Sequence, residues 1–114
     1  MTFEWDPKKS DENFARRGFD FEFAALIFAS TYVEFDDTRH DYGERRVIAF
    51  GVADGIPLTV VFTDRSGGQR AVIRRIISAR LSKRQERRRY AEAIEASQPP
   101  PDADADADAD AGPR

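Results

Sequence analysis

Four β-type segments joined by short links constrain the fold of this chain most strongly. The segments cover residues 31–35, 45–52, 58–63 and 71–80, and β-branched and aromatic side chains are frequent in them. Turn-forming residues separate the later segments, beginning with Asp54-Gly55. Parallel pairing would require crossover connections of about a dozen residues or more, which these links do not provide. The pattern therefore predicts a four-stranded antiparallel sheet.

Two helical segments precede the predicted strands. Asp6 and Pro7 are typical of a helix start, and Gly18 is suited to the positive φ that ends a helix. A second helix is predicted over residues 21–28 with Asp20 as its cap, and seven of these eight residues are apolar. This second helix is therefore expected to be buried.

A basic helix is predicted to follow the last strand. Ser82 and Gln85 form a Ser-x-x-Gln capping box at its start. Cations close to a helix N-terminus oppose the helix dipole, so stability does not explain the basic residues that follow, and a binding role is favoured. These residues are Lys83, Arg84, Arg87, Arg88 and Arg89. The predicted fold class is α+β, with two N-terminal helices packed on one face of the four-stranded antiparallel sheet and a C-terminal helix after it.

The chain is long enough for one domain. Of its 114 residues, 1–97 are predicted to form that single domain, and the Pro-, Asp- and Ala-rich residues 98–114 are expected to be a disordered acidic tail. There are no cysteines, which excludes disulfides and thiolate metal sites. No apolar stretch approaches the ~20 residues of a membrane span, and the N-terminus lacks a secretory pattern, so a cytoplasmic protein without membrane contact is expected.

The net charge of −3 conceals a strongly uneven distribution. Residues 1–64 contain 7 basic and 13 acidic side chains, whereas residues 65–90 contain 10 basic side chains and a single acidic one, Glu86. A dense cationic region on a small domain is typical of a site that binds a polyanion.

Several kinds of catalytic site lack their characteristic residues in this sequence. His40 is the only histidine, and the acidic residues around it do not have the spacing of a calcium-binding loop. Its loop is instead expected to be a solvated turn. No Gly-x-Ser-x-Gly motif, phosphate-binding loop or dinucleotide fingerprint is present, so no metal or other cofactor is expected.

Arginines are frequent in and around the predicted last strand. Strict alternation places Arg75 on one face of that strand and Arg74 and Arg80 on the other. A basic side chain on the face that packs against the helices is expected only near its rim, where the charge reaches water. Arg46 and Arg65, from the two preceding strands, are expected to converge on the same edge.

Arginines from separate strands have a chemistry suited to RNA cleavage. When a 2′-oxygen attacks the neighbouring phosphorus, negative charge grows on the phosphorane oxygens, and fixed guanidinium groups stabilise that charge. The planar fork of arginine also donates two parallel hydrogen bonds to phosphate. The competing interpretation is that these arginines are solvated ion-pair partners of Glu44, Asp64 and Glu86.

The sequence also resembles a known family over residues 3–90. Its opening, Phe3-Glu4-Trp5-Asp6, and its late motif Ile77-Ser78-Ala79-Arg80 are similar to those of the BrnT family of toxins. Further matches are Lys8, Asn13, Gly18, Phe21 and Ala24; Gly43-Glu44-x-Arg46 and Gly51; Leu58-x-Val60-Val61 with Thr63 and Arg65; Arg75; and Glu86-Arg87-Arg88 with Tyr90. One departure is Arg16-Arg17-Gly18, where the family commonly has Lys-His-Gly. Arg17 keeps a charge there but is not a base near neutral pH.

The resemblance implies a toxin of a type II toxin–antitoxin system with a RelE-like fold. Such a toxin is a ribonuclease that inhibits translation by cutting RNA. The resemblance further implies a cognate BrnA-like antitoxin with a ribbon-helix-helix DNA-binding domain, so that operator DNA is contacted only through the antitoxin. The charge pattern agrees on the type of substrate, and a metal-independent endoribonuclease is expected.

The same resemblance nominates individual site residues. The candidate catalytic residues are Arg46, Arg65, Arg75, Arg80, Glu44 and Tyr90, and the candidate RNA-binding residues are Lys83, Arg84, Arg87 and Arg88. The arginines would hold phosphate, a carboxylate is available as a base, and a phenol can donate a proton or stack on a nucleobase. The alternatives are an ion pair between Glu44 and Arg46 and a core-capping Tyr90. For the whole protein, the alternative is a non-catalytic nucleic-acid-binding or regulatory protein that acts with a DNA-binding partner.

Overall fold

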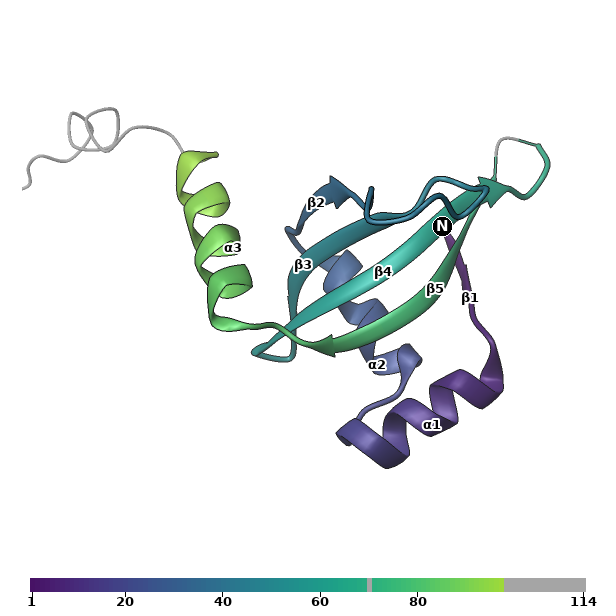
Figure 1. Cartoon of the computed structure of the whole chain (residues 1–114), viewed down its shortest axis with the longest axis horizontal. Helices are drawn as coiled ribbons and strands as arrows, with labels where there is room; N and C mark the ends of the chain where they lie inside the picture. Colours follow the sequence, from purple (N-terminus) through teal and green to yellow (C-terminus); the bar gives the residue numbers. More distant parts are fainter. Residues whose placement is uncertain (70, 98–114) are drawn as a thin grey trace, which may run out of the picture.

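The computed structural model describes residues 1–69 and 71–97 as an α+β fold with one mixed sheet (Figure 1). Its strands are β1 (Thr2–Glu4), β2 (Val33–Asp36), β3 (Val47–Ala53), β4 (Ile56–Ser66) and β5 (Val72–Leu81). Its helices are α1 (Pro7–Arg17), α2 (Phe21–Ala24) and α3 (Arg84–Ala96), and a 3₁₀ helix, η1 (Ala25–Ala29), follows α2. None of the helices in this part of the chain combines the length and apolar character that crossing a bilayer requires. The predicted tail at 98–114 lies outside the described residues.

The sheet has five strands in the order β1-β5-β4-β3-β2. Strands β2 to β5 form the predicted antiparallel meander, in which each strand pairs with its neighbour in sequence. The prediction of a purely antiparallel, four-stranded sheet is wrong at one edge, because Thr2–Glu4 adds a parallel strand beside Ile73–Arg75. Three residues are too few to show an alternating pattern, and their partner strand lies far away in the sequence.

The starts of α1 and α2 and the end of α1 are where the sequence predicts them. Asp6 and Asp20 accept hydrogen bonds from backbone amides in the first turns of α1 and α2, both at 2.9 Å. Gly18 ends α1 in the left-handed conformation, with a φ of 89°. The helix predicted over residues 21–28 is divided, because α2 ends at Ala24 and the chain continues as η1.

Two buried polar side chains attach α1 to the rest of the fold. The Ser10 hydroxyl accepts a hydrogen bond from the Phe21 amide at 2.9 Å, and the Asn13 side-chain amide donates to the Phe19 carbonyl at 3.0 Å. Phe19 lies in the segment that leads into α2, and Phe21 is the first residue of α2. These bonds compensate for the few apolar side chains that α1 contributes to the core.

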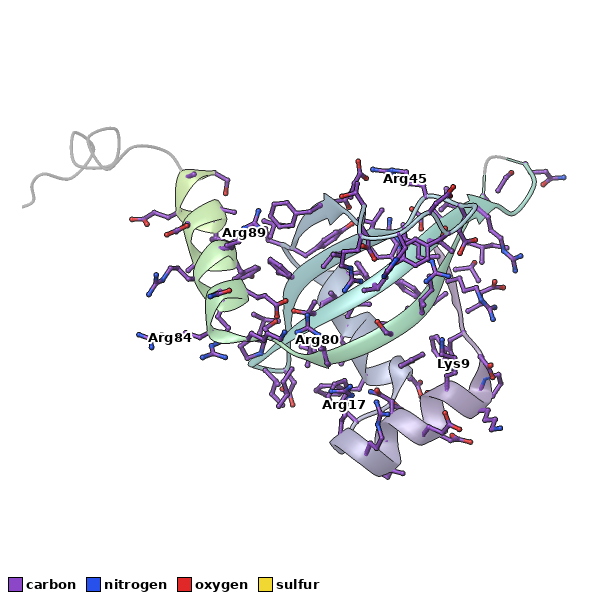
Figure 2. All side chains as sticks on the ribbon, in the orientation of Figure 1. Lys9, Arg17, Arg45, Arg80, Arg84 and Arg89 are labelled. Carbon is purple, nitrogen blue, oxygen red and sulfur yellow. The ribbon has the colours of Figure 1, made fainter. Side chains whose placement is uncertain are left out.

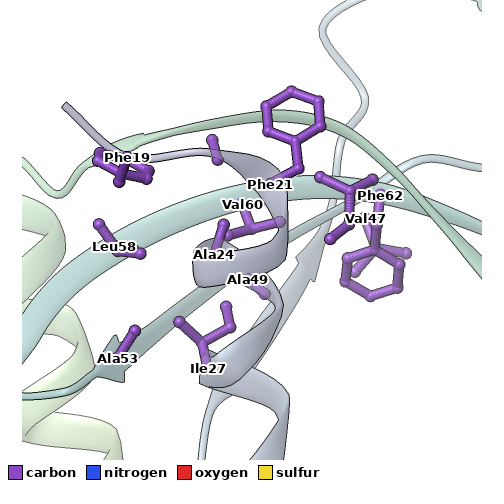
Figure 3. Packing of buried hydrophobic residues seen from close by; sticks show 12 residues of the cluster. Phe19, Phe21, Ala24, Ile27, Val47, Ala49, Ala53, Leu58, Val60 and Phe62 are labelled. Atoms are coloured by element: carbon purple, nitrogen blue, oxygen red, sulfur yellow. The ribbon is translucent and has the colours of Figure 1, made fainter. Parts of the chain in front are cut away.

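The main core lies between the sheet and the α2–η1 segment (Figure 3). It consists of Phe19, Phe21, Ala24, Ile27, Val47, Ala49, Ala53, Leu58, Val60, Phe62, Ile76 and Ala79. Ile27 lies directly over Gly51 of β3, where an added Cβ would be only 2.8 Å from the Ile27 Cβ. The lack of a side chain at Gly51 therefore lets η1 approach the sheet closely. We call this side of the sheet the helix face.

A β-bulge interrupts the pairing of β4 with β5. Val61 pairs with Ser78, but the next residue of β4, Phe62, pairs with Ile76. Ile77 is therefore an extra residue in β5, with no partner residue in β4. On either side of Ile77 the alternation of side chains between the two faces is out of phase.

The bulge places Arg80 on the same face of the sheet as Arg75. The prediction that Arg80 shares a face with Arg74 is wrong, because it assumes uninterrupted alternation through Ile77. Arg74 lies on the helix face. It is two residues before Ile76, a core residue, and both point to the same side of β5. The inserted residue thus places Arg80 with Arg75 rather than with the buried Arg74.

Arg74 is buried, with only 6 % of its surface exposed. It donates two hydrogen bonds to Asp64, both at 2.8 Å, and one to the Tyr32 hydroxyl at 3.0 Å, and its guanidinium carbon lies 4.0 Å from the centroid of the Phe62 ring. Burial lowers the pKa of Arg74, but the hydrogen bonds to Asp64 and Tyr32 outweigh this effect and raise the pKa above its usual value. The expectation that a basic side chain on the core face lies only at the rim is therefore wrong, because an ion pair and aromatic rings satisfy the charge.

α3 begins one residue later than the capping pattern predicts. Its N-cap residue is Lys83, whose backbone amide donates to the Glu86 carboxylate at 2.7 Å. Glu86 also accepts two hydrogen bonds from Arg80, both at 2.7 Å. Ser82 is buried and its hydroxyl is 2.8 Å from that of Thr59. The predicted capping box is wrong because Ser82 is engaged with the sheet.

Replacement of Gly51 by alanine is expected to destabilise the protein by about 1–3 kcal/mol. The new methyl group would meet the Ile27 Cβ at 2.8 Å, and rotation of a side chain relieves neither atom. In urea denaturation the midpoint should fall while the slope m stays unchanged. A Gly51→Ala variant as stable as the wild type would contradict the close packing of η1 on β3.

Glu86 makes a contribution to stability that depends on pH. The hydrogen bonds from Arg80 lower the pKa of Glu86 from 4.5 to about 2, against the opposing effect of burial. Because the folded-state pKa lies below the unfolded-state value, the ionised carboxylate stabilises the fold fully above about pH 4.5. That stabilisation is lost as the pH falls through the folded-state pKa near 2.

Glu86→Gln is therefore expected to lower the free energy of unfolding by about 1–3 kcal/mol at neutral pH. The difference from the wild type should shrink as the pH is lowered from about 5 to about 2, as measured by denaturant unfolding at several pH values. Glu92→Gln is the matched control, since it removes the same charge from an exposed position of α3. A difference that stays constant over this pH range would rule out the ionised Glu86 as its origin.

Candidate nucleic-acid interface

The sheet carries its candidate arginines on the face opposite the helix face. Strand register assigns Arg65, Arg75 and Arg80 to this side, and the alternation that buries Val47 in the core turns Arg46 to it as well. We call this side of the sheet the arginine face. In Figure 1 it is turned toward the reader, and α2 lies behind the sheet. Arg46, Arg65, Arg75 and Arg80 therefore lie on one face of the sheet.

Arg65 and Arg75 share one carboxylate. Glu4 of β1 lies beside Arg75 in the parallel register, and its Oε2 accepts a hydrogen bond from Arg75 at 3.2 Å and another from Arg65. The side chains of Arg65 and Arg75 are 58 % and 42 % exposed, so solvent and a ligand can reach both. A single negative charge therefore positions two accessible positive charges.

Arg46 approaches the same area from the other side of β4. Its Nε donates to Glu44 at 3.3 Å, and its guanidinium carbon lies 4.0 Å from the centroid of the Tyr42 ring. The His40 ring is in turn 5.6 Å from Tyr42, measured between centroids. Stacking on Tyr42 fixes the plane of the guanidinium group and leaves its outer N–H groups available for a ligand.

Thr63 of β4 marks the centre of this arrangement. It pairs with Arg75 on one side, and its hydroxyl donates to the Arg45 carbonyl at 2.7 Å on the other, next to Arg46. Neighbouring strands are about 4.8 Å apart, so the backbones that carry Arg46 and Arg75 are separated by about 10 Å. Arginine side chains are long enough to reach a common ligand from these positions. We refer to Arg46, Arg65 and Arg75, with Glu4 and Glu44, as the arginine cluster.

Two other candidate catalytic residues lie outside the arginine cluster. Arg80 pairs with Thr59, which is four residues from Thr63, or about 13 Å along β4. Both of its terminal nitrogens are bound to Glu86. Tyr90 lies on α3, where its hydroxyl donates to the Thr31 carbonyl at 3.2 Å. The structure therefore separates the start of α3 from the cluster around Thr63.

The basic residues of α3 differ in how they are bound. Arg87 donates to the Ser82 carbonyl at 2.8 Å. Lys83, Arg84 and Arg88 are exposed and have no acidic partner within 4.0 Å among residues 1–69 and 71–97. Arg89, which is labelled in Figure 2 and is not among the RNA-binding candidates, covers the Phe35 ring at 4.0 Å from its centroid. The outer side of α3 thus presents uncompensated positive charge beside the sheet.

Sequence reasoning missed two participants in the arginine cluster. Glu4 was recognised only as part of a motif, because its role depends on β1 joining the sheet beside β5. Tyr42 lies in a polar loop with no periodic pattern, and only its contact with Arg46 reveals its position. An aromatic residue close in sequence to a candidate phosphate-binding arginine is the one signal that was available.

The loop that precedes β3 is not a fully solvated turn. Asp37 is buried and binds Arg39 at 2.7 Å. The hydrogen bonds from Arg39 lower the pKa of Asp37 to about 2, although burial opposes the shift. In the part of the chain that the structure describes, no three His, Cys, Asp or Glu side chains are grouped as metal ligands.

Comparison with known protein families identifies the chain. No curated protein matches the chain significantly. A family model described as "Ribonuclease toxin, BrnT, of type II toxin-antitoxin system" matches residues 5–86, which include the arginines of the arginine face but not Tyr90. The matched segment is well over half of the 114 residues. The resemblance of the motifs is thereby confirmed, and the chain belongs to the BrnT family of ribonuclease toxins of type II toxin–antitoxin systems.

Proposed function

We propose that this toxin is a metal-independent endoribonuclease that cuts RNA and thereby inhibits translation, with the arginine cluster as its active site. The observation that carries the proposal is that Arg46, just before β3, Arg65 of β4 and Arg75 of β5 surround one accessible area at Thr63. Three guanidinium groups supply the fixed positive charge that an RNA-cleaving transition state requires.

The proposed reaction is an internal transesterification. Glu44 takes the proton of the 2′-hydroxyl as its oxygen bonds to phosphorus, and Arg46 beside it orients that carboxylate. Arg65 and Arg75 bind the non-bridging oxygens and stabilise their growing charge. The bond from phosphorus to the 5′-oxygen then breaks, and this oxygen takes a proton from solvent. The products carry a 2′,3′-cyclic phosphate and a 5′-hydroxyl.

The remaining candidate residues are assigned to RNA binding rather than to the chemical step. Arg80 and the α3 residues extend the positive surface away from the scissile phosphate. Tyr90 is available to stack on a nucleobase, as its family position suggests. The α3 residues concerned are Lys83, Arg84, Arg87 and Arg88.

A type II system supplies an antitoxin partner for this toxin. We propose that the partner is a BrnA-like protein with a ribbon-helix-helix domain, and that the complex contacts operator DNA through that domain. Covering the arginine face is a direct means of neutralising the toxin, because substrate and antitoxin then compete for the same positive surface.

A second candidate function is non-catalytic RNA binding. The observation in its favour is that each arginine of the arginine face forms an ion pair, with Glu4, Glu44 or Glu86. Such pairs are typical of structural arginines as well as of resting active sites. The two functions differ in whether cut ends are produced.

Arg75→Ala and Arg46→Ala are each expected to reduce the rate of RNA cleavage by about 10²–10³-fold, because Arg75 stabilises the transition state and Arg46 orients the Glu44 base. Cleavage of an RNA substrate in EDTA is the measurement, together with identification of the cyclic phosphate ends. Arg45→Ala is the matched control, since its exposed side chain pairs with Asp36 and it is next to Arg46 in the chain. Circular dichroism checks the fold of each variant.

The outcomes distinguish the two candidate functions. Full cleavage by both variants would overturn the proposed active site, and loss of wild-type cleavage in EDTA would overturn metal independence. Binding of RNA that weakens steeply with salt but yields no cut ends would establish the non-catalytic alternative.

Lys83→Gln combined with Arg84→Gln is expected to weaken binding equally for RNAs of different base sequence. Loss of two phosphate contacts should make the slope of log K against log salt less steep by about 1.4. Fluorescence anisotropy over a salt series measures this slope. An unchanged slope would show that α3 does not contact the RNA backbone.

A further inference from the structure

A polar groove runs between α1 and the second half of β5. Its volume is about 360 Å³, which is in the range of ligand-binding clefts. Lys9, Arg16 and Arg17 line it from α1, and Ile77, Ser78 and Arg80 line it from β5. Figure 2 labels Lys9 and Arg17 on α1 and Arg80 on the strand that passes above that helix. We call this feature the α1–β5 groove.

The groove follows from two features of the fold. Strand β1 pairs only with Ile73–Arg75. In the part of the chain that the structure describes, the outer edge of β5 after the bulge therefore has α1 beside it instead of a strand. The buried bonds of Ser10 and Asn13 anchor α1 to the segment that leads into α2. The edge of β5 and the exposed side of α1 therefore form the two walls.

Positive charge in the groove is largely uncompensated. Four cationic side chains line it, and Glu12 is the one acidic side chain among the lining residues. Lys9, Arg16 and Arg17 form no ion pair within 4.0 Å in residues 1–69 and 71–97. The arginines of the arginine face are all paired, so the groove offers the stronger attraction for an external anion.

The groove is continuous with the arginine face. Ser78 and Arg80 line the groove and also lie on that face, on the same side of β5 as Arg75. On α1, Lys9 and Arg16 are seven residues apart, which corresponds to about 10 Å along the helix axis. The positive charges thus follow an extended path that leads away from the arginine cluster.

We propose that the α1–β5 groove binds the sugar–phosphate backbone of the RNA strand that continues from the active site. This inference rests on the proposed function and adds a second segment to the substrate path. Backbone rather than base recognition is favoured because the lining is cationic, and the one aromatic side chain that lines it, Phe21, is 98 % buried and offers no ring face for stacking. Binding in the groove is accordingly independent of base sequence.

The test uses the full chain with Arg16→Gln combined with Arg17→Gln. The probe is a fluorescent single-stranded RNA with 2′-O-methyl groups, which cannot be cleaved because it lacks the 2′-hydroxyl nucleophile. At about 0.1 M salt the dissociation constant is expected to rise by about 10-fold, and the salt slope should become less steep by about 1.4. Lys8→Gln combined with Arg45→Gln removes the same charge outside the groove and should change the dissociation constant by less than about twofold.

Each outcome bears on the inference in a defined way. Equal binding by the wild type and the groove variant overturns RNA binding in the groove, and so does equal weakening in the groove and control variants. The cleavage assay of the wild type remains a separate test of the active site. Wild-type protein that neither cleaves RNA nor binds the probe overturns both proposals. A groove variant that binds the probe normally but escapes neutralisation by its antitoxin identifies the groove as a protein-docking site and overturns RNA binding there.

Discussion

One additional residue in one strand determines how the charged surface of this protein is organised. Ile77 shifts the phase of β5, so that Arg80 lies on the same face as Arg75 and opposite to the buried Arg74. Without that shift, Arg80 would share a face with the core residues and would have to be accommodated there. The bulge thus reconciles a strand rich in arginine with a sheet that needs one apolar side, and β-bulges near functional sites are a recurrent means of redirecting side chains.

Two adjacent arginines in β5 illustrate how differently the same side chain is used. Arg74 is enclosed by Asp64, Tyr32 and the Phe62 ring, so removal of one partner would leave a buried charge unsatisfied. Arg75 shares Glu4 with Arg65 and remains accessible to solvent. The acidic partner of Arg75 comes from the first strand of the chain, so formation of the arginine cluster requires the parallel edge of the sheet to be in place.

Local signals were enough to predict much of the fold, and non-local pairing accounts for what was missed. The caps at Asp6 and Asp20 and the antiparallel meander follow from neighbouring residues and link lengths. The strand at Thr2–Glu4 and the bulge at Ile77 depend on partners distant in sequence, which a single sequence does not specify. The arginines nominated from the sequence lie on one face. Arg80 does so only because of the bulge at Ile77, which strict alternation does not predict. Their catalytic and binding roles stay predictions.

The attachment of α3 has a consequence for how the toxin can diversify. None of the residues of α3 is fully buried, and the helix is held through the Glu86 bonds at its first turn, its contacts with β3, and the contacts of Arg89 and Tyr90 with the region of β2. Substitutions on its outer side therefore leave the core intact. Natural variation can adjust the number of positive charges there almost independently of foldability, so that surface charge and thermal robustness evolve as separate traits.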